Sequence, residues 1–468
     1  MSGDLNARSA AWAAGLTFAQ IPPEVVESTK LRVLDLIGVM LAASPLPLVA
    51  AARRASIVVD QGTGARILGA AEDTSLMTAA FVNGVMTAVL EFDDTHIESF
   101  IHPTAPCVSV AFPEAQRHGL PGRRLIEAVL LGSELACRLG RITPVRLHTL
   151  GFHPTAVFGV FGAVHALARL RGLAAPVIAD AIGAAGSLSA GLNASFEDGS
   201  STKMMHVGFA ATGALRAVAL AEAGISGPGP VFDGRFGWFR SHVQGREDLR
   251  FGALLDALGE RWEVLNIAPK LHPCAFTMMP HIECALSLRA THGFAPGDIA
   301  AVTCRIGRRS FATVCEPVAD KRRPATTWHG RISLQHTLAE ALVLGRMDKD
   351  AYAEASLRDP VINAVADLVV HEDDPATEAT RSGGEVSVTL RDGRVLTHRI
   401  DDMRGTRANP IPAHDIIGKF LANTRDTLTA SQAEATIETV LRLDRLDDVA
   451  PLFAGLEPRR PPAPFNPG

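Results

Sequence analysis

Two long segments of the chain, residues 77–92 and 157–170, are apolar on nearly every side when wound as helices. A helix without a polar face has to be enclosed by other elements. Alanine and glycine are frequent in these segments and in the run Gly183-Ala184-Ala185-Gly186, and small residues let helix axes approach closely. The sequence therefore predicts a compact, mainly α fold built around buried helices.

The pattern changes once along the chain, near residue 268. Residues 300–306 alternate like a strand, and 386–390 with 395–400 predict a hairpin around a glycine-containing turn. A helix is expected at 332–344. Helical patterns return after Pro412, and residues 431–434 predict a capping-box start for the last helix.

These patterns predict a large all-helical domain formed by residues 1–267 plus 409–455. A smaller α+β lid domain, 268–408, is inserted into it, and a disordered tail follows at 456–468. Ligand sites are common at domain boundaries, so we expect a cleft there.

Composition narrows the classes of function. The chain has 468 residues, of which 47% are hydrophobic and 20% charged, which is typical of a soluble globular protein. A net charge of −5 without a long basic block argues against nucleic acid as a partner. Residues 33–52 are interrupted by Asp35 and two prolines, so no membrane association is expected. There is no basic-then-apolar signal peptide and no C-x-x-C pair among six cysteines, so we expect a cytoplasmic protein with reduced thiols.

Lys203 is the most informative single residue. The chain has six lysines among 45 basic residues, and Lys203 lies amid hydroxyl side chains at 200–202, before a run of small residues. A lysine ammonium loses its proton readily when desolvated, whereas arginine does not. Lys203 is therefore a candidate acid–base group, and the alternative is a surface lysine at a helix start.

Four segments place histidine or lysine beside proline or glycine at the ends of apolar helices. They are 91–104, 151–155, 200–208 and 270–274. Loops held by rigid elements commonly carry function. Asp93, Asp94, His96 and His102 could instead bind a metal, but their spacing matches no closed zinc pattern, so no metal site is predicted. No G-x-S-x-G elbow indicates a serine nucleophile.

Four strings carry a resemblance to a known family: Glu-Phe-Asp-Asp-Thr-His with His-Pro-Thr, Gly-Phe-His-Pro-Thr, Ser-Thr-Lys-Met-Met-His-Val-Gly, and Arg-Gly-Thr-Arg-Ala-Asn-Pro. The chain resembles the MmgE/PrpD family over nearly its whole length. The resemblance implies a helical domain with an α+β lid, a homodimer, and chemistry without an iron–sulfur cluster or other cofactor. Members include 2-methylcitrate dehydratases, cis-aconitate decarboxylases and an iminodisuccinate epimerase.

The matching motifs imply roles for eight residues. The catalytic set is His102, His153, Lys203 and Asp93, and the substrate-binding set is Thr95, Lys270, His272 and His336. Within these sets we assign His153 and Lys203 as the acid–base pair, with Asp93 orienting His102.

The lid departs from the family pattern in two places. Met278-Met279 stand where the family often has a histidine, and His336 stands where it has a tyrosine. A histidine facing the cleft would be partly protonated near neutral pH, so activity is expected to fall on the alkaline side as His336 loses its proton.

The function predicted from the sequence is a cofactor-independent lyase, either a dehydratase or a decarboxylase. Its substrate would be a small di- or tricarboxylate such as 2-methylcitrate or cis-aconitate, from which a proton next to a carboxylate is removed. The alternatives are an epimerase of a dicarboxylate and a non-catalytic ligand-binding homologue.

Overall fold

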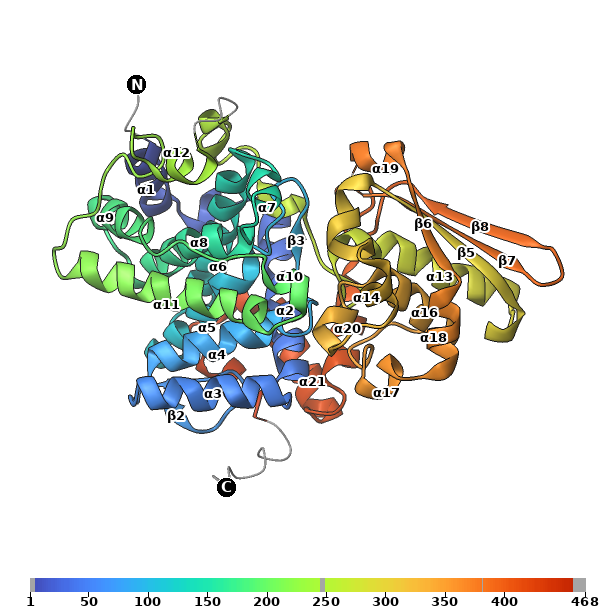
Figure 1. The fold of residues 1–468 in the computed structure, drawn as a ribbon. Coiled ribbons are helices and arrows are strands. Elements are labelled where there is room, and N and C mark those ends of the chain that lie inside the picture. Colours follow the sequence, from blue (N-terminus) through green and yellow to red (C-terminus); the bar gives the residue numbers. More distant parts are fainter. Residues whose placement is uncertain (1–4, 245–248, 381, 458–468) are drawn as a thin grey trace.

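The computed structural model describes residues 5–244, 249–380 and 382–457. It is mainly helical, as predicted, and Figure 1 shows a large helical body beside a smaller body that holds a four-stranded sheet. The predicted domain boundaries, and the smaller body's role as an inserted lid, stay predictions. The predicted disordered tail, 456–468, lies outside the described residues from 458 onward, and its first residue, Leu456, is described and buried.

Within the described residues, the helical body contains twelve α-helices before the chain enters the sheet-bearing body. They are α1 (Leu5–Gly15), α2 (Pro23–Ala43), α3 (Pro47–Val59), α4 (Leu76–Ala88), α5 (Thr104–His118), α6 (Gly122–Arg141), α7 (Arg146–Thr149), α8 (Pro154–Arg171), α9 (Ala175–Ala185), α10 (Ser195–Asp198), α11 (Thr202–Glu222) and α12 (Trp238–Val243). Two-residue strands β1 (Ala65–Arg66) and β2 (Asp73–Thr74) pair with each other, and β3 (Thr95–His96) pairs with β4 (Ile267–Ala268).

Both segments predicted to be enclosed lie inside this body. Helix α8 is buried along almost its whole length and contacts α5, α6 and α11. Helix α4 is also buried, but it ends at Ala88, and the chain then turns through Glu91, whose φ is 51°. The predicted helix over 77–92 was therefore too long, because this turn ends it.

Glycine sets the closest helix contacts, as the small-residue runs predicted. A Cβ added at Gly84 of α4 would lie 2.5 Å from the backbone nitrogen of Gly208 in α11. A Cβ at Gly132 of α6 would lie 2.6 Å from the carbonyl oxygen of Gly162 in α8. No larger residue fits at these two crossings without moving the helices apart.

The smaller body is built on the sheet β6-β5-β7-β8, whose strands are β5 (Ile299–Ile306), β6 (Val369–Asp373), β7 (Gly384–Leu390) and β8 (Val395–Ile400). Strands β5 and β6 are parallel, and the other two pairings are antiparallel. The predicted strand at 300–306, the hairpin around Gly393 and the helix at 332–344 are confirmed. The helices of this body are α13 (Met279–His292), α14 (Val318–Arg322), α15 (Thr327–Gly330), α16 (Leu334–Leu344), α17 (Glu354–Leu357), α18 (Pro360–Asp367) and α19 (Pro375–Thr380).

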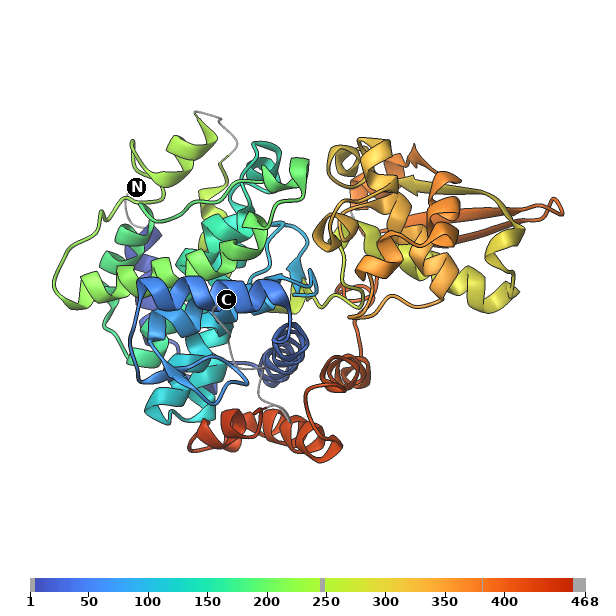
Figure 2. The ribbon, with the colours of Figure 1, turned by 60° about the horizontal axis from the view of Figure 1, so that its bottom comes forward.

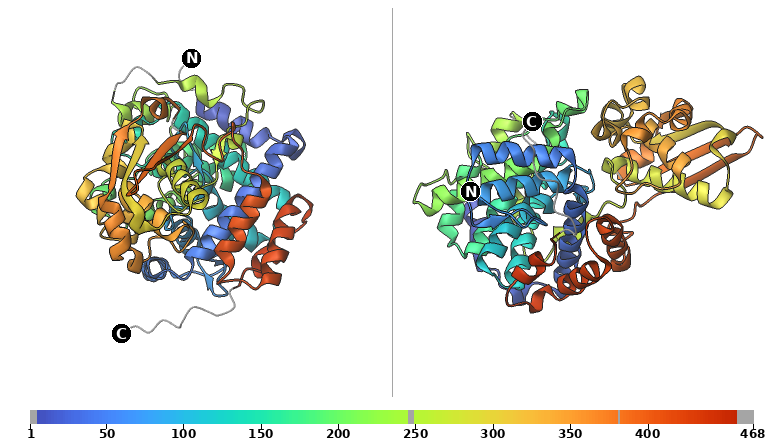
Figure 3. Two further views of the ribbon diagram at one scale, coloured as in Figure 1. Left: turned by 90° about the vertical axis from the view of Figure 1, so that its right-hand side faces the viewer. Right: turned by 90° about the horizontal axis from the view of Figure 1, so that it is seen from below.

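After β8 the chain returns to the helical body. Helices α20 (Ala413–Thr424) and α21 (Ala430–Leu441) pack against α2, and α22 (Ala450–Ala454) packs against α5 (Figure 2). In the right-hand view of Figure 3 this red segment lies along the lower edge of the helical body, on the side from which the smaller body projects. Helix α21 begins two residues earlier than predicted, because the side chains of Thr429 and Gln432 form the capping box.

In the part of the chain that the structure describes, one helix, α11, is long and apolar enough to cross a membrane, and 61% of its apolar window is buried inside the protein. Helices α2 and α3 pass the same test only as a pair, and that pair bends by 90°.

Candidate active site

Three long helices of the helical body begin at one place and carry the predicted site residues. His102 and Pro103 precede α5, His153 and Pro154 begin α8, and Lys203 lies in the first turn of α11. The three helices contact one another. The N-terminus of a helix carries a positive partial charge, so their meeting point favours an anion.

Glu91 links the two site lysines. Its carboxylate pairs with the ammonium group of Lys203 through one oxygen and with that of Lys270 through the other, at 2.9 Å. The Lys270 ammonium also lies 3.6 Å from Asp93. Burial alone would raise the pKa of Glu91, but the two lysines hold it well below its usual range. Burial alone would lower the pKa of Lys270, but Glu91 and Asp93 hold it above its usual value. The cluster is therefore a buried array of two anions and two cations.

His102 is held in one tautomer. Its Nδ1 lies 2.9 Å from the carbonyl oxygen of Asp94, and since a carbonyl only accepts, Nδ1 carries the proton. Thr95 Oγ1 lies 3.0 Å from the same nitrogen. Nε2 therefore carries the lone pair, and it lies 3.7 Å from a carboxylate oxygen of Glu91. Burial and the nearby lysines lower the pKa of His102 to about 4, against the charge of Asp93. His102 is neutral at pH 7 and can accept a proton.

His153 lies beside His102, with ring centroids 6.2 Å apart. Its backbone N–H donates to the carbonyl of Gly191 at 3.0 Å, and its ring contacts His206. Burial lowers the pKa of His153 well below its usual value, and the positive charge of Lys203 lowers it further. Two neutral imidazoles thus flank an ion-paired lysine.

A pocket of about 1110 Å³, including its open mouth, separates these groups from the smaller body. From the helical body it is lined by Glu91, Thr95, His102, His148, His153 and Lys203, and the smaller body supplies Thr277, Arg309, Ser310, Thr313 and Glu378. Apolar side chains, including Phe100, Phe196, Phe276 and Ile332, form much of the remaining wall. The ammonium group of Lys203 lies 5.0 Å from the ring centre of Trp328, so the smaller body also covers the lysine.

The structure brings six of the eight predicted site residues together. Thr95, His102, His153 and Lys203 line the pocket, and Asp93 and Lys270 lie directly behind them, fully buried. These residues come from segments more than 170 positions apart in sequence. The other two lie elsewhere.

His272 and His336 are not among the described residues that line this pocket. His272 Nδ1 donates to the carbonyl of Met347 at 2.9 Å. His336 is fully buried in the smaller body, with Nε2 3.2 Å from the carboxylate of Glu340. In this structure both side chains take part in packing within the smaller body.

Glu91 is the site residue that sequence reasoning missed. The acidic run at 91–94 was identified, but its first carboxylate was not assigned a role. Two buried lysines require buried carboxylates to balance their charge. Since two lysines lie in the matching motifs, a second carboxylate beside Asp93 was to be expected, and this requirement could have identified Glu91.

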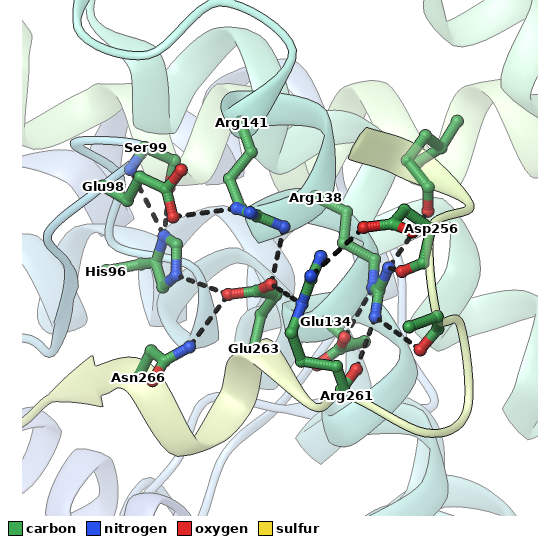
Figure 4. Close-up of polar contacts among 12 residues, drawn as sticks. His96, Glu98, Ser99, Glu134, Arg138, Arg141, Asp256, Arg261, Glu263 and Asn266 are labelled. Atoms are coloured by element: carbon green, nitrogen blue, oxygen red, sulfur yellow. Dashed lines mark hydrogen bonds and ion pairs between the residues drawn. The ribbon is translucent and has the colours of Figure 1, made fainter. Parts of the chain in front are cut away.

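The alternative metal set does not converge. Asp94 accepts a hydrogen bond from the hydroxyl of Thr104 at 2.6 Å, and burial raises its pKa to about 6. His96 contacts Ser99 at 2.7 Å and Glu263 at 3.3 Å, in a polar network that joins β3 to α6 (Figure 4). This network fixes the loop that carries Thr95 and His102.

A smaller acidic group remains beside the pocket. Glu91, Asp93 and His102 have potential ligand atoms within 4.8 Å of one another. Both oxygens of Glu91 are already paired with ammonium groups, which would repel a divalent cation. The carboxylates of Glu91 and Asp93 therefore balance the charges of the two lysines and do not form a metal site.

Comparison with known proteins identifies the family of the chain. Residues 7–249 match the MmgE/PrpD N-terminal domain, and residues 272–445 match the MmgE/PrpD C-terminal domain. The chain belongs to the MmgE/PrpD family.

Relatives with curated names are enzymes. The chain is 25% identical to cis-aconitate decarboxylase of Aspergillus terreus, over 97% of both chains. It is 25% identical to cis-aconitate decarboxylase of Homo sapiens, over 96% of this chain and 93% of that protein. It is 28% identical to 2-methylcitrate dehydratase of Cupriavidus necator, over 39% of this chain and 40% of that protein. Both names describe lyases.

Proposed function

We propose that this protein is a cofactor-independent lyase that acts on a small tricarboxylate or dicarboxylate, with decarboxylation of a cis-aconitate-like acid as the first candidate. The observation that carries the proposal is the pairing of two neutral histidines, His102 and His153, with the ammonium group of Lys203 on one wall of one pocket. The relatives that match over nearly the full length are named decarboxylases, which favours carbon dioxide loss over water loss.

The charges around the pocket support an anionic substrate. The residues at the N-termini of α5, α8 and α11 lie beside it in one body, and Arg309 is among the residues that line it from the other. Arg309 is paired with Glu378 at 2.5 Å, so a substrate carboxylate would replace that partner. Each charge-assisted contact of this kind also orients the substrate.

The chemistry requires a positioned proton carrier. Decarboxylation of an unsaturated tricarboxylate breaks the bond between carbon and a carboxylate, releases carbon dioxide, and leaves its electron pair on a carbon that must be protonated. Dehydration instead removes a proton beside a carboxylate and protonates the departing hydroxyl group. In both reactions negative charge builds on the carboxylate oxygens that remain, and a fixed cation stabilises it.

We assign His153 as the group that exchanges a proton with substrate carbon, and Lys203 as the ammonium group that holds the reacting carboxylate and completes the acid–base pair. His102 has its free Nε2 on the same wall and can exchange the second proton that dehydration requires. Asp93 and Lys270 lie behind, and with Glu91 they fix the charge and position of these groups. This division follows from which side chains reach the pocket.

The direct test is to incubate the purified protein with cis-aconitate, 2-methylcitrate and citrate in separate reactions. Carbon dioxide release and the absorbance of unsaturated acid are followed, and Lys203→Met is compared with Lys349→Met. Lys349 pairs with Asp350 and Asp426, away from the pocket. We expect turnover of at least one substrate, a loss of about 10²–10⁴-fold for Lys203→Met and no loss for Lys349→Met.

The alternatives give different results in the same experiment. Solvent deuterium that enters recovered dicarboxylate, without carbon dioxide or alkene, identifies an epimerase. Binding of a polycarboxylate without turnover identifies a non-catalytic homologue. Wild-type protein that neither binds nor converts any of these acids contradicts the proposal.

We also propose that the protein is a cytoplasmic homodimer in which residues 268–408 act as a lid over the helical domain. Light scattering on the purified protein gives the oligomeric state directly. A monomer at micromolar concentration contradicts the assembly, and it leaves the pocket assignment unchanged because every residue named in the pocket comes from one chain.

A further inference from the structure

His206 forms a close pair with the pocket histidine His153. It lies one turn after Lys203 on α11, is 3% exposed, and is not among the described residues that line the pocket. Its Nδ1 lies 2.9 Å from Nδ1 of His153, and the ring centroids are 5.0 Å apart. The pair joins the start of α8 to the start of α11.

Gly191 holds both rings in place. Its carbonyl accepts the backbone N–H of His153 at 3.0 Å. A Cβ at Gly191 would lie 3.6 Å from the ring of His206 and only 2.4 Å from the Cβ of Ala156. No side chain fits there, so the backbone packs directly against the histidine pair.

The contact couples the tautomers of the two rings. A hydrogen bond between two Nδ1 atoms contains one proton, so one ring donates and the other accepts. When His153 donates, its Nε2 is a lone pair and can act as a base. When His206 donates, His153 carries its proton on Nε2 and can act as an acid.

We infer that His206 is a positioning residue that determines which nitrogen of His153 carries the proton. It accepts a hydrogen bond from Nδ1–H of His153 while Nε2 of His153 gives a proton to substrate carbon or takes one from it, and the same bond holds the ring in both states. In decarboxylation the Nε2 proton goes to the carbon that has lost carbon dioxide, in dehydration Nε2 takes the proton removed beside the carboxylate, and His206 keeps its own proton on Nε2 throughout. This inference rests on the proposed function, in which His153 exchanges the proton.

The surroundings explain why such a partner is needed. Among the described residues, the charged or titratable groups that face His153 are Lys203, His206, His102 and His148, and each of them, when it carries its proton, disfavours a positive charge on His153. In many enzymes a carboxylate beside a histidine stabilises the cationic form of the ring. Here a neutral imidazole takes that place, and burial with the Lys203 charge lowers the pKa of His206 to about 4, so it stays an acceptor.

The kinetic test compares His206→Phe with His206→Asn, because the asparagine amide can reach the position of Nδ1 and a phenylalanine cannot bond there. We expect kcat/KM to fall about 10–100-fold in His206→Phe and to recover most of that loss in His206→Asn. The limb of the pH–rate profile that reports the titration of His153 should shift to lower pH in His206→Phe, because the His153 cation loses its acceptor. Unchanged kcat/KM and an unchanged limb in His206→Phe would overturn the inference.

A second measurement needs no variant of His206 and no substrate. In wild-type protein with ¹⁵N-labelled histidine, the signals of His153 and His206 should show opposite neutral tautomers, one protonated at Nδ1 and one at Nε2. The signal that is lost in the His153→Gln variant belongs to His153. This variant keeps Gly191 and Lys203. Two Nε2-protonated rings would overturn the inference even if the protein is an active lyase. Opposite tautomers in a protein without turnover would leave the pair intact and contradict the proposed function alone.

Discussion

Glu91→Gln is the most informative single change that the structure suggests. It removes one negative charge and keeps the size of the side chain. In the native protein both carboxylate oxygens are paired, with Lys203 and with Lys270, and the residue is 4% exposed. After the change, Lys270 keeps Asp93 at 3.6 Å, and Lys203 loses its ion pair with Glu91.

The expected cost follows from these contacts. At 2.9 Å and an effective dielectric constant of about 20, the attraction between the carboxylate and one ammonium group is about 6 kcal/mol. Much of it is offset by the cost of desolvating the charges and by proton loss from a lysine. Breaking one partner of a buried pair typically costs about 3–5 kcal/mol, and we expect a loss of stability in that range. Since single domains commonly have about 5–15 kcal/mol, the variant should still fold.

The assay is urea unfolding followed by fluorescence of the four tryptophans, together with kcat/KM for the substrate identified in the wild type. The pKa of Glu91 is lower in the folded protein than in the unfolded chain, so its contribution is complete above the unfolded pKa of about 4.3 and is lost as pH falls below it. The difference between wild type and variant should therefore be constant from about pH 5 to 8 and shrink below about pH 4.3. Activity should fall about 10²-fold or more, because Lys203 loses the partner that positions it.

Glu114→Gln is the matched control. Glu114 is 1% exposed and pairs with Arg171 at 2.7 Å, at the ends of α5 and α8 that lie away from the pocket. It should cost about 1–3 kcal/mol of stability and leave kcat unchanged. If Glu91→Gln loses less than 1 kcal/mol and keeps kcat/KM within threefold, the two lysines do not depend on Glu91 and the charge-balance argument fails.

Three further predictions concern other parts of the protein. Burial lowers the pKa of His165 and His281 to about 4. Because the unfolded chain binds a proton at each of these histidines below about pH 6.5, each should lower the unfolding free energy by about 3 kcal/mol as pH falls from about 6.5 to 4. Urea midpoints should drop steeply in this range, and flat midpoints would contradict the burial of the two side chains. His336→Phe should lower the unfolding free energy and leave the alkaline limb of the pH–rate profile unchanged, since the side chain packs against Glu340 outside the pocket; a shifted limb would show that it reaches the substrate. Arg309→Gln should raise KM about 10-fold with little change in kcat, whereas Arg308→Gln, whose side chain pairs with Asp373, should change neither; equal effects would show that the Arg309 side chain does not contact substrate.

Much of the fold could be predicted because its signals are local. Apolar runs at helical spacing, Pro154 at the start of α8 and the turn around Gly393 each reflect preferences of a few neighbouring residues. The errors concerned the ends of helices. Helix α4 stopped at Ala88, and α21 began at Ala430, because a single turn residue or cap decides where a helix terminates.

The site was predictable to the extent that short motifs mark it. The sequence by itself determined that His102, His153 and Lys203 lie at the starts of buried helices, because the proline or hydroxyl residues beside them begin those helices. The sequence also shows that the basic side chain beside these histidines is a lysine, which can lose its proton, and not an arginine. Only the tertiary structure decided which of these groups meet. Glu91, Lys203 and Lys270 are distant in the chain, and their pairing depends on how α4, α11 and the segment after β4 pack. The same packing placed His336 inside the smaller body, since burial and charge pairing are properties of the folded neighbourhood and not of any local sequence pattern.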